Sequence, residues 1–245
     1  MTRDSTRDRG APPGATGNEK TFRDSLYGRR KGKPLSPRRA GLMANAYPAL
    51  AVDVAHPAPK NLAALFPHAM SEVRLEIGFG GGEHLVAEAV RAPDVGFIGV
   101  EPFVNGMAKA VTAVVDGNLE NVRLFGGEAS VLLDWLPSAS LAAVDLLYPD
   151  PWPKKRHWKR RFVSDENLDR LARVLAPGSA FRFASDIPSY VEWTLAHLMK
   201  RTDLSWEAER AADWLTPFPN WPSTRYEAKA LAAGRVPTYL AFKRT

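Results

Sequence analysis

Residues 73–83 form a short apolar run that ends in glycines: Val73-Arg74-Leu75-Glu76-Ile77-Gly78-Phe79-Gly80-Gly81-Gly82-Glu83. Glycines in such a place let the backbone turn tightly and come close to a ligand. Helical spacing follows over residues 82–91, through Leu85, Val86 and Ala89. The stretch therefore predicts a buried strand, a tight turn that a ligand can approach, and a helix.

The alternation of strand-like and helix-like segments continues to the C-terminus. Further strands are expected at 95–100, 122–125, 141–147, 180–184 and 238–243, and further helices at 103–115, 129–135, 167–175, 188–200 and 226–233. Repeated strand–helix units predict an α/β fold with an open, mostly parallel sheet covered by helices on both faces. In such sheets ligands bind beyond the carboxyl ends of the strands.

Acidic side chains stand at the ends of four expected strands. Glu76 lies at the end of the first strand, Glu101 follows the second and Asp150 follows the fourth, while Glu128 follows the third. The carboxyl ends of parallel strands meet at one edge of the sheet. We therefore expect Glu76, Glu101 and Asp150 to lie close together. An acid in the position of Glu101 can accept hydrogen bonds from both hydroxyls of a ribose, and Glu128 is suitably placed to meet an adenine amino group.

Three kinds of ligand site compete with a simple tight turn as explanations for the glycines. A P-loop is excluded because no Gly-Lys-Ser/Thr follows. A dinucleotide site would require a small residue three positions after Gly80, where Glu83 would instead crowd the helix and repel a pyrophosphate. A ligand without phosphates fits better, and Glu76 calls for a cationic partner if it is buried. S-adenosylmethionine carries an ammonium and a sulfonium and no phosphate, so the set of acids predicts it as the cofactor.

The loop after the fourth strand combines an acid with a dense group of cations. Asp150 lies among prolines at 149, 151 and 153, which restrict the backbone and remove amide donors. Six of the eight residues from Lys154 to Arg161 are Lys or Arg, with a histidine and Trp158 between them. Such a run can be only a solvated loop. Next to an acid at a strand end, however, it indicates an active site for a polyanionic substrate.

Basic charge is concentrated in two places. Residues 1–40 hold eleven Lys or Arg against four Asp or Glu, whereas the whole chain of 245 residues carries a net charge of only +6. We interpret 1–40 as a basic, largely disordered tail, either solubilising or binding nucleic acid, and 41–245 as a single domain. Basic charge that is concentrated in two places indicates surfaces that bind a polyanion.

Composition excludes several classes of protein. The absence of cysteine excludes disulfides, zinc–thiolate sites and thiol nucleophiles. The five histidines show no metal-ligand spacing, and no Gly-x-Ser-x-Gly motif is present, so we expect no metal and no serine hydrolase. No apolar run approaches a membrane helix, and no signal peptide is seen, so we expect a cytoplasmic protein that does not bind a membrane.

Taken together, these motifs resemble those of the bacterial tRNA (guanine-N7-)-methyltransferases. The resemblance spans residues 27–245, and its most specific part is Pro149-Asp150-Pro151-Trp152-Pro153-Lys154 with the basic residues after it. The other matching stretches are Glu76-Ile77-Gly78-Phe79-Gly80, Gly99-Val100-Glu101, Arg156-His157-x-Lys159-Arg160-Arg161, Ser185-Asp186 and Thr224-x-Tyr226-Glu227. The resemblance implies a Rossmann-like sheet of seven strands, the last one antiparallel. It also implies transfer of methyl from S-adenosylmethionine to guanine N7 in the variable loop of tRNA.

The resemblance also implies roles for individual residues. Asp150 would be the catalytic residue, between cofactor and substrate. The cofactor would be contacted by Glu76, Gly78, Gly80, Glu101, Glu128 and Asp150. The tRNA would be contacted by Lys154, Arg156, Lys159, Arg160, Arg161, Asp186, Thr224, Arg225, Tyr226 and Glu227. The family usually has an aspartate in place of Glu128, so the adenine contact departs from the pattern.

Three alternatives remain open from the sequence. A methyltransferase with another acceptor would share the glycine turn, but it gives no reason for six cations beside the acid. An RNA-binding protein with a decayed cofactor site would not need the acids at the strand ends. A nicotinamide oxidoreductase is disfavoured by Glu76 and Glu83.

Overall fold

The computed structural model describes residues 30–245, and the expectations for residues 1–29 lie outside this range. The expected boundary at residue 40 falls inside the first helix, α1 (Pro37–Asn45), which begins after Ser36. The hydroxyl of Ser36 accepts a hydrogen bond from the backbone N–H of Arg39, as a helix N-cap does. The division into a tail and one domain stays a prediction.

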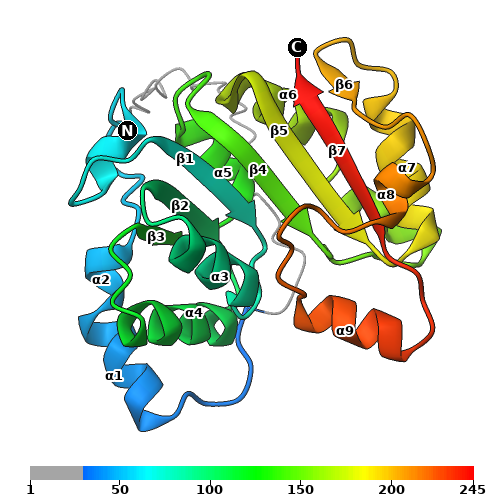
Figure 1. The fold of residues 1–245 in the computed structure, drawn as a ribbon. Coiled ribbons are helices and arrows are strands. Elements are labelled where there is room, and N and C mark those ends of the chain that lie inside the picture. The colour runs from blue at the N-terminus through cyan, green and yellow to red at the C-terminus, as the bar shows by residue number, and fades with distance from the viewer. Residues whose placement is uncertain (1–29) are drawn as a thin grey trace, which may run out of the picture.

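A sheet of seven strands runs through the described part of the chain, as Figure 1 shows. Its members are β1 (Glu72–Ile77), β2 (Val95–Val100), β3 (Val122–Phe125), β4 (Leu141–Leu147), β5 (Leu175–Ser185), β6 (Leu204–Trp206) and β7 (Thr238–Arg244). The order is β3-β2-β1-β4-β5-β7-β6, and β7 is antiparallel to both of its neighbours. The predicted fold class, including the antiparallel last strand, is therefore confirmed. The three-residue strand β6 was not predicted.

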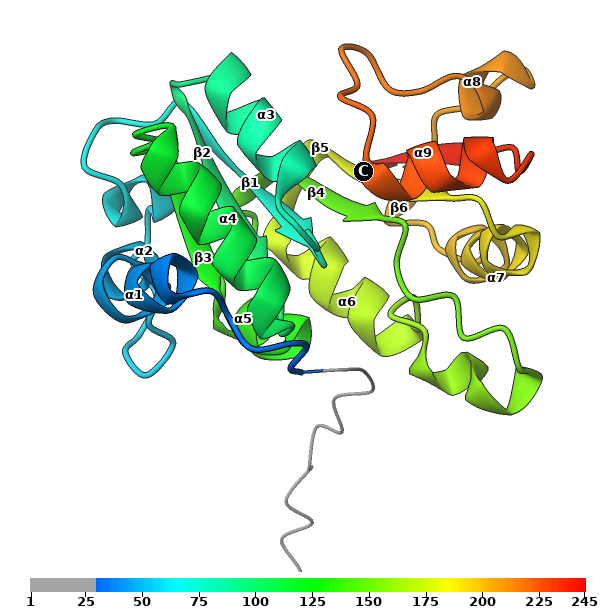
Figure 2. The ribbon, with the colours of Figure 1, turned by 90° about the horizontal axis from the view of Figure 1, so that it is seen from below.

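Helices cover both faces of the sheet (Figures 1 and 2). Besides α1, they are α2 (Tyr47–Leu50), α3 (Glu83–Arg91), α4 (Val104–Asp116), α5 (Ala129–Trp135), α6 (Asp165–Val174), α7 (Pro188–Leu198), α8 (Ala212–Leu215) and α9 (Arg225–Ala232), with 3₁₀ turns η1 (Leu62–Leu65) and η2 (Lys155–Arg160). One face is apolar and packs on α5, α6 and α7. The other packs on α3 and α4 over β2 and β3, and on Phe218 and Trp221 over the far strands.

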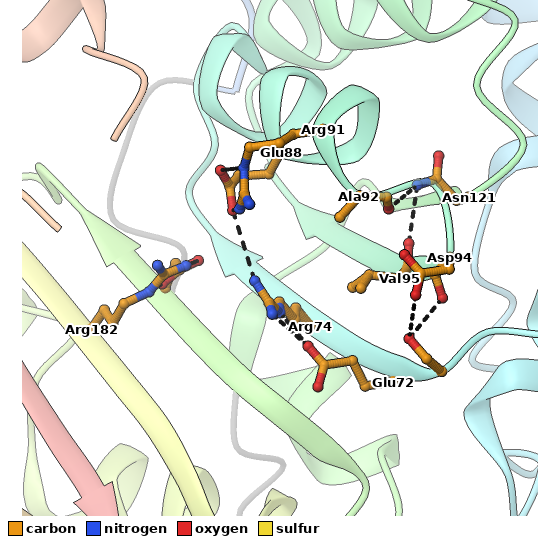
Figure 3. A network of polar contacts seen from close by, with 11 residues as sticks. Glu72, Arg74, Glu88, Arg91, Ala92, Asp94, Val95, Asn121 and Arg182 are labelled. Atoms are coloured by element: carbon orange, nitrogen blue, oxygen red, sulfur yellow. Dashed lines mark hydrogen bonds and ion pairs between the residues drawn. The ribbon is translucent and has the colours of Figure 1, made fainter. Parts of the chain in front are cut away.

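The second face carries a row of charged residues across the middle of the sheet. Glu76 of β1 pairs in register with Asp145 of β4, which pairs with Arg182 of β5. Residues in register on neighbouring strands point to the same face, so three charges lie side by side on this face of the sheet. Figure 3 shows the edge of this region, where Arg74 reaches the carboxylates of Glu72 and Glu88.

The basic segment before α1 packs along the start of α4. The carbonyl oxygen of Arg30 accepts a hydrogen bond from the backbone N–H of Val104, one of the N–H groups that a helix start leaves without a partner. Asn105 holds the next turn of the segment through the N–H of Gly32 and the carbonyl of Lys33, both at 2.7 Å. This part of the basic N-terminal region therefore lies on the domain.

Candidate active site

A pocket of about 350 Å³ opens at the carboxyl ends of β1, β2 and β4. This is the place where open α/β sheets bind ligands. Six of the predicted site residues line it: Gly78, Gly80, Glu101, Asp150, Arg225 and Tyr226. The sequence did not identify the apolar wall, which is made by Ile77, Pro102, Phe103, Leu146, Tyr148, Pro149 and Phe162.

The glycine turn forms the floor of the pocket. Gly78 and Gly80 have φ angles of 73° and 60°, in the left-handed region that a side chain disfavours. The turn is also crowded from behind, because a Cβ at Gly106 of α4 would collide with the carbonyl oxygen of Gly80. Gly106 is a structural requirement of the turn that the sequence analysis missed, since it lies 26 residues further along the chain.

Glu101 ties the turn to the end of β2. Its two carboxylate oxygens accept hydrogen bonds from the backbone N–H groups of Gly80 (2.8 Å) and Phe103 (2.9 Å). Burial raises the pKa of Glu101 against these two hydrogen bonds, and the nearby charge of Asp150 raises it further. Each carboxylate oxygen has a second lone pair, so Glu101 can still accept hydrogen bonds from a ligand in the pocket.

Asp150 lies on the pocket side of the proline-rich loop. Its neighbours Tyr148 and Trp152 have φ angles of 49° and 44°, a conformation that is costly for residues with side chains and that clusters at functional sites. Although Asp150 is exposed on the scale of the whole residue, partial burial of its carboxyl group raises its pKa. Within residues 30–245 the carboxylate receives no hydrogen bond or ion pair.

Glu76 is buried just outside the pocket lining, and its partner is a histidine. One carboxylate oxygen lies 2.8 Å from Nδ1 of His84 in the first turn of α3. Burial raises the pKa of Glu76. For His84, burial disfavours the charged form, but the Glu76 carboxylate outweighs it and the pKa is raised. The partner expected for the buried carboxylate of Glu76 is therefore supplied by the protein itself, through the imidazole of His84.

The cationic loop divides into exposed residues and one buried arginine. Lys154, Arg156 and Lys159 are exposed, and the guanidinium of Arg160 lies 5.0 Å from the ring centre of Trp152. Arg161 is only 3% exposed. It donates hydrogen bonds to the carbonyl of Pro151, at 2.9 Å, and to the carbonyl and hydroxyl of Ser189, at 2.7 and 3.1 Å. Arg161 therefore anchors the loop to α7.

The remaining predicted residues lie around the pocket. Asp186 follows β5 and forms an ion pair with Arg235 at 2.5 Å. Glu128 precedes α5 and lies 3.6 Å from Arg30 of the N-terminal segment. Thr224 caps α9 by accepting a hydrogen bond from the N–H of Glu227. None of these four predicted residues, Asp186, Glu128, Thr224 and Glu227, lines the pocket.

The arrangement suits a cationic ligand better than a phosphorylated one. Two carboxyl groups with raised pKa values face the pocket, opposite one cationic side chain, Arg225. No group of His, Cys, Asp and Glu in residues 30–245 could hold a metal ion. No helix in the same range is both long and apolar enough to cross a membrane.

The fold and the position of the pocket define a Rossmann-like α/β protein with a ligand site at the carboxyl ends of its strands. Among solved structures, the 16S rRNA methyltransferase KamB shares the fold with a TM-score of 0.51 at 17% identity, over 72% of this chain and 89% of that one. TrmN from Thermus thermophilus also gives 0.51, at 13% identity, over 75% of this chain and 48% of that one. A family model described as "Putative methyltransferase" matches residues 70–239.

Sequence relatives identify the family. The tRNA (guanine-N(7)-)-methyltransferase of Rhizobium meliloti is 58% identical over 90% of this chain and 95% of its own length. The protein of the same name from Mesorhizobium japonicum is 57% identical with the same coverage. The chain belongs to the tRNA (guanine-N(7)-)-methyltransferase family, as the resemblance of its motifs predicted.

Proposed function

We propose that this enzyme transfers a methyl group from S-adenosylmethionine to N7 of a guanine in the variable loop of tRNA, forming 7-methylguanosine. The observation that carries the proposal is the place of Asp150. Asp150 lines the pocket at one end of a loop, and the other end of the loop carries exposed cations. The pocket proposed for the methyl donor and the surface proposed for the RNA therefore lie within ten residues of each other in the chain. Membership of the family supports the same reaction.

The residues of the pocket fit S-adenosylmethionine. The ammonium and sulfonium of this cofactor would face Glu101 and Asp150, two carboxyl groups of the pocket lining whose pKa values are raised by burial. Glu101 could accept hydrogen bonds from ribose hydroxyls with its free lone pairs. The close approach of Gly78 and Gly80 allows the ligand to lie against the backbone. We also assign Glu76 and Glu128 to the cofactor site, Glu76 through the oxygen that His84 does not bind.

Four cations of the loop, of which three are exposed and Arg160 is half-buried, are assigned to the tRNA backbone. Lys154, Arg156, Lys159 and Arg160 would contact phosphates, which position an RNA without reading its sequence. Asp186 and residues 224–227 would contact the target nucleotide. A cytoplasmic location, where tRNA is available, follows as part of this proposal.

Asp150 would act by orientation and by its charge, and not as a base. Guanine N7 carries a free lone pair, so no proton has to be removed before it attacks the methyl carbon. The cofactor supplies a methyl group activated by a positively charged sulfur. The purine becomes cationic as the new bond forms, and a fixed carboxylate nearby stabilises that charge. Asp150 could also accept hydrogen bonds from N1–H and the amino group of guanine, which would align N7 with the methyl group.

The test is methyl incorporation from labelled S-adenosylmethionine into tRNA that lacks 7-methylguanosine, followed by nucleoside analysis. A 7-methylguanosine product supports the proposal, and its loss from tRNA with the variable-loop guanine replaced supports the position. A different methylated nucleoside would keep the donor and discard the guanine assignment. Cofactor binding without transfer to tRNA would point to another acceptor.

A further inference from the structure

His84 lies at the centre of the buried polar cluster on the second face of the sheet. It is the second residue of α3, directly after the glycine turn, and it is 3% exposed. Its Nδ1 bonds to Glu76, while its Nε2 has no hydrogen-bond partner within the described residues. A hydrogen bond therefore holds the imidazole at Nδ1 but not at Nε2. The orientation of the ring also depends on what packs against it.

The ring of His84 packs against Trp221, which comes from the segment before α9. The ring centres are 4.8 Å apart, with an angle of 43° between the planes. The indole N–H of Trp221 donates a hydrogen bond of 2.8 Å to Glu227. Glu227 is also bonded by the hydroxyl of Tyr239 on β7. Through its contact with Trp221, His84 therefore links Glu76 at the end of β1 to Glu227 in the first turn of α9.

The first turn of α9 leads back to the pocket. Tyr226, next to Glu227, packs its ring over Gly80, so that a Cβ at Gly80 would lie 3.3 Å from the ring. Arg225 lines the pocket beside it and bonds to the hydroxyl of Tyr226 at 2.8 Å. Figure 2 shows α3 and α9 on the same side of the sheet. Together with the chain itself, these contacts link six residues in a ring around the glycine turn: Glu76, His84, Trp221, Glu227, Tyr226 and Gly80.

Three charged residues lie around His84, two carboxylates and one arginine. Glu76 approaches it from β1, Asp145 from β4 and Arg182 from β5. Asp145 and Arg182 neutralise each other through two hydrogen bonds. The remaining carboxylate of Glu76 is left for His84, and losing either member would leave a buried polar group without its partner, which is costly.

We propose that His84 is a positioning residue of the methyltransferase, which holds Glu76 in place for the methyl donor and, through Trp221, holds the first turn of α9 in place for the tRNA. The inference rests on the proposed function for the identity of the two substrates. His84 does not line the pocket, so it would act through its neighbours Glu76 and Trp221. His84 contacts Glu76 through Nδ1 and Trp221 through its ring. Each contact can therefore be removed without the other.

Two substitutions separate the contacts. His84→Asn keeps an N–H donor close to the place of Nδ1 and removes most of the ring that packs on Trp221. His84→Phe keeps a ring against Trp221 and removes the bond to Glu76. We expect His84→Asn to raise the KM for tRNA about tenfold with little change in the Kd of S-adenosylhomocysteine, and His84→Phe to do the reverse. A tenfold change corresponds to about 1.4 kcal/mol, the size of one hydrogen bond or ring contact.

Trp221→Phe provides an independent measurement should a substitution at His84 impair folding. It keeps a ring for His84 to pack on but removes the N–H that donates to Glu227, so it should raise the KM for tRNA in the same way as His84→Asn. In the double variant the two effects should be less than additive, because both act through one path. Melting temperatures of all variants would be recorded alongside.

Crossed effects on the two ligands would support the proposal, because a general loss of stability would change both in the same direction. Equal changes in the Kd and the KM for both variants, or no change in either, would overturn it. If the wild type formed no 7-methylguanosine, the proposed function would fail. The predicted effect of His84→Phe on the cofactor site would still be tested by the Kd of S-adenosylhomocysteine.

Discussion

Glu101 and Asp150 face one pocket from opposite sides of β1, because their strands β2 and β4 are the two neighbours of β1 in the sheet. The charge of Asp150 adds to the burial that raises the pKa of Glu101. Among the described residues, Arg225 is the one cationic side chain of the pocket lining, and it comes from a different part of the chain. This pair of acids therefore forms a site with an excess of negative charge, and a cation entering it should bind with a measurable dependence on pH.

Binding of S-adenosylmethionine should release protons in weakly acidic solution. A bound cation favours the ionised carboxylates, so it lowers the raised pKa values of Glu101 and Asp150. Between the bound and the free pKa values the free protein holds more protons than the complex, and affinity must rise as the pH rises through that range. Titration calorimetry in two buffers of different ionisation enthalpy would measure the release. Equal binding enthalpies in both buffers would show that these acids do not face the cation.

Asp150→Asn should impair methyl transfer far more than cofactor binding. The amide keeps the shape of the side chain but loses the charge that stabilises the developing purine cation. We expect single-turnover rates to fall on the order of 10²–10³-fold, as for other lost electrostatic contacts in active sites, with the Kd of S-adenosylhomocysteine changed less than about tenfold. The rate that remains should depend weakly on pH. A wild-type rate that follows one carboxylate titration while chemistry is limiting would instead make Asp150 a base.

The cations of the loop should contribute to affinity for tRNA through phosphates. Lys154→Ala with Lys159→Ala should lower the slope of log affinity against log salt by about 0.7–0.9 for each lost contact, and should raise the KM more than they lower kcat. Lys200→Ala is a matched control. This exposed lysine follows α7 and lies at the amino end of the parallel strands, away from the pocket. Equal slopes for the double variant and the control would remove the loop from the RNA surface.

Local patterns in the sequence were sufficient for six of the seven strands and for two of the four acids at the strand ends. Apolar runs with turn residues marked six strands, and the rule that ligands bind at their carboxyl ends brought Glu101 and Asp150 into one pocket. The three-residue strand β6 was missed because Leu204–Trp206 is too short to show a period. It is a strand only because β7 offers it an edge.

Contacts between distant parts of the chain were not predictable from local patterns. Nothing near His84 in the sequence indicates Trp221, which approaches it only when the segment before α9 folds over the sheet. Likewise Arg161 looks like the other cations of its loop, but its neighbours in space are Ser189 and the aromatic rings of α7. In both cases the role of the residue is set by tertiary packing.

Gly106→Ala should disturb the cofactor turn from behind. The added methyl group would collide with the carbonyl oxygen of Gly80 and also approach the side chain of Glu101. Overpacking of this kind typically costs about 1–3 kcal/mol, and here the displaced atoms form the floor of the pocket. We expect weaker binding of S-adenosylhomocysteine together with a lower melting temperature. Gly41→Ala is the control, because a Cβ there meets no atom within 4 Å, and it should leave binding unchanged.

Arg161→Ala should act on stability, unlike substitutions at the exposed cations of the same loop. It removes three hydrogen bonds from a buried guanidinium and a stacking partner 4.4 Å from the ring of Trp158. We expect the free energy of unfolding to fall by about 2–4 kcal/mol, since hydrogen bonds to charged groups are the stronger ones. Arg161→Lys should restore less than half of this loss, because an ammonium cannot reproduce the planar fork that reaches both Pro151 and Ser189. Denaturant titrations measure the loss directly. Full stability of Arg161→Ala combined with a lower salt slope for tRNA would instead place this arginine on the RNA.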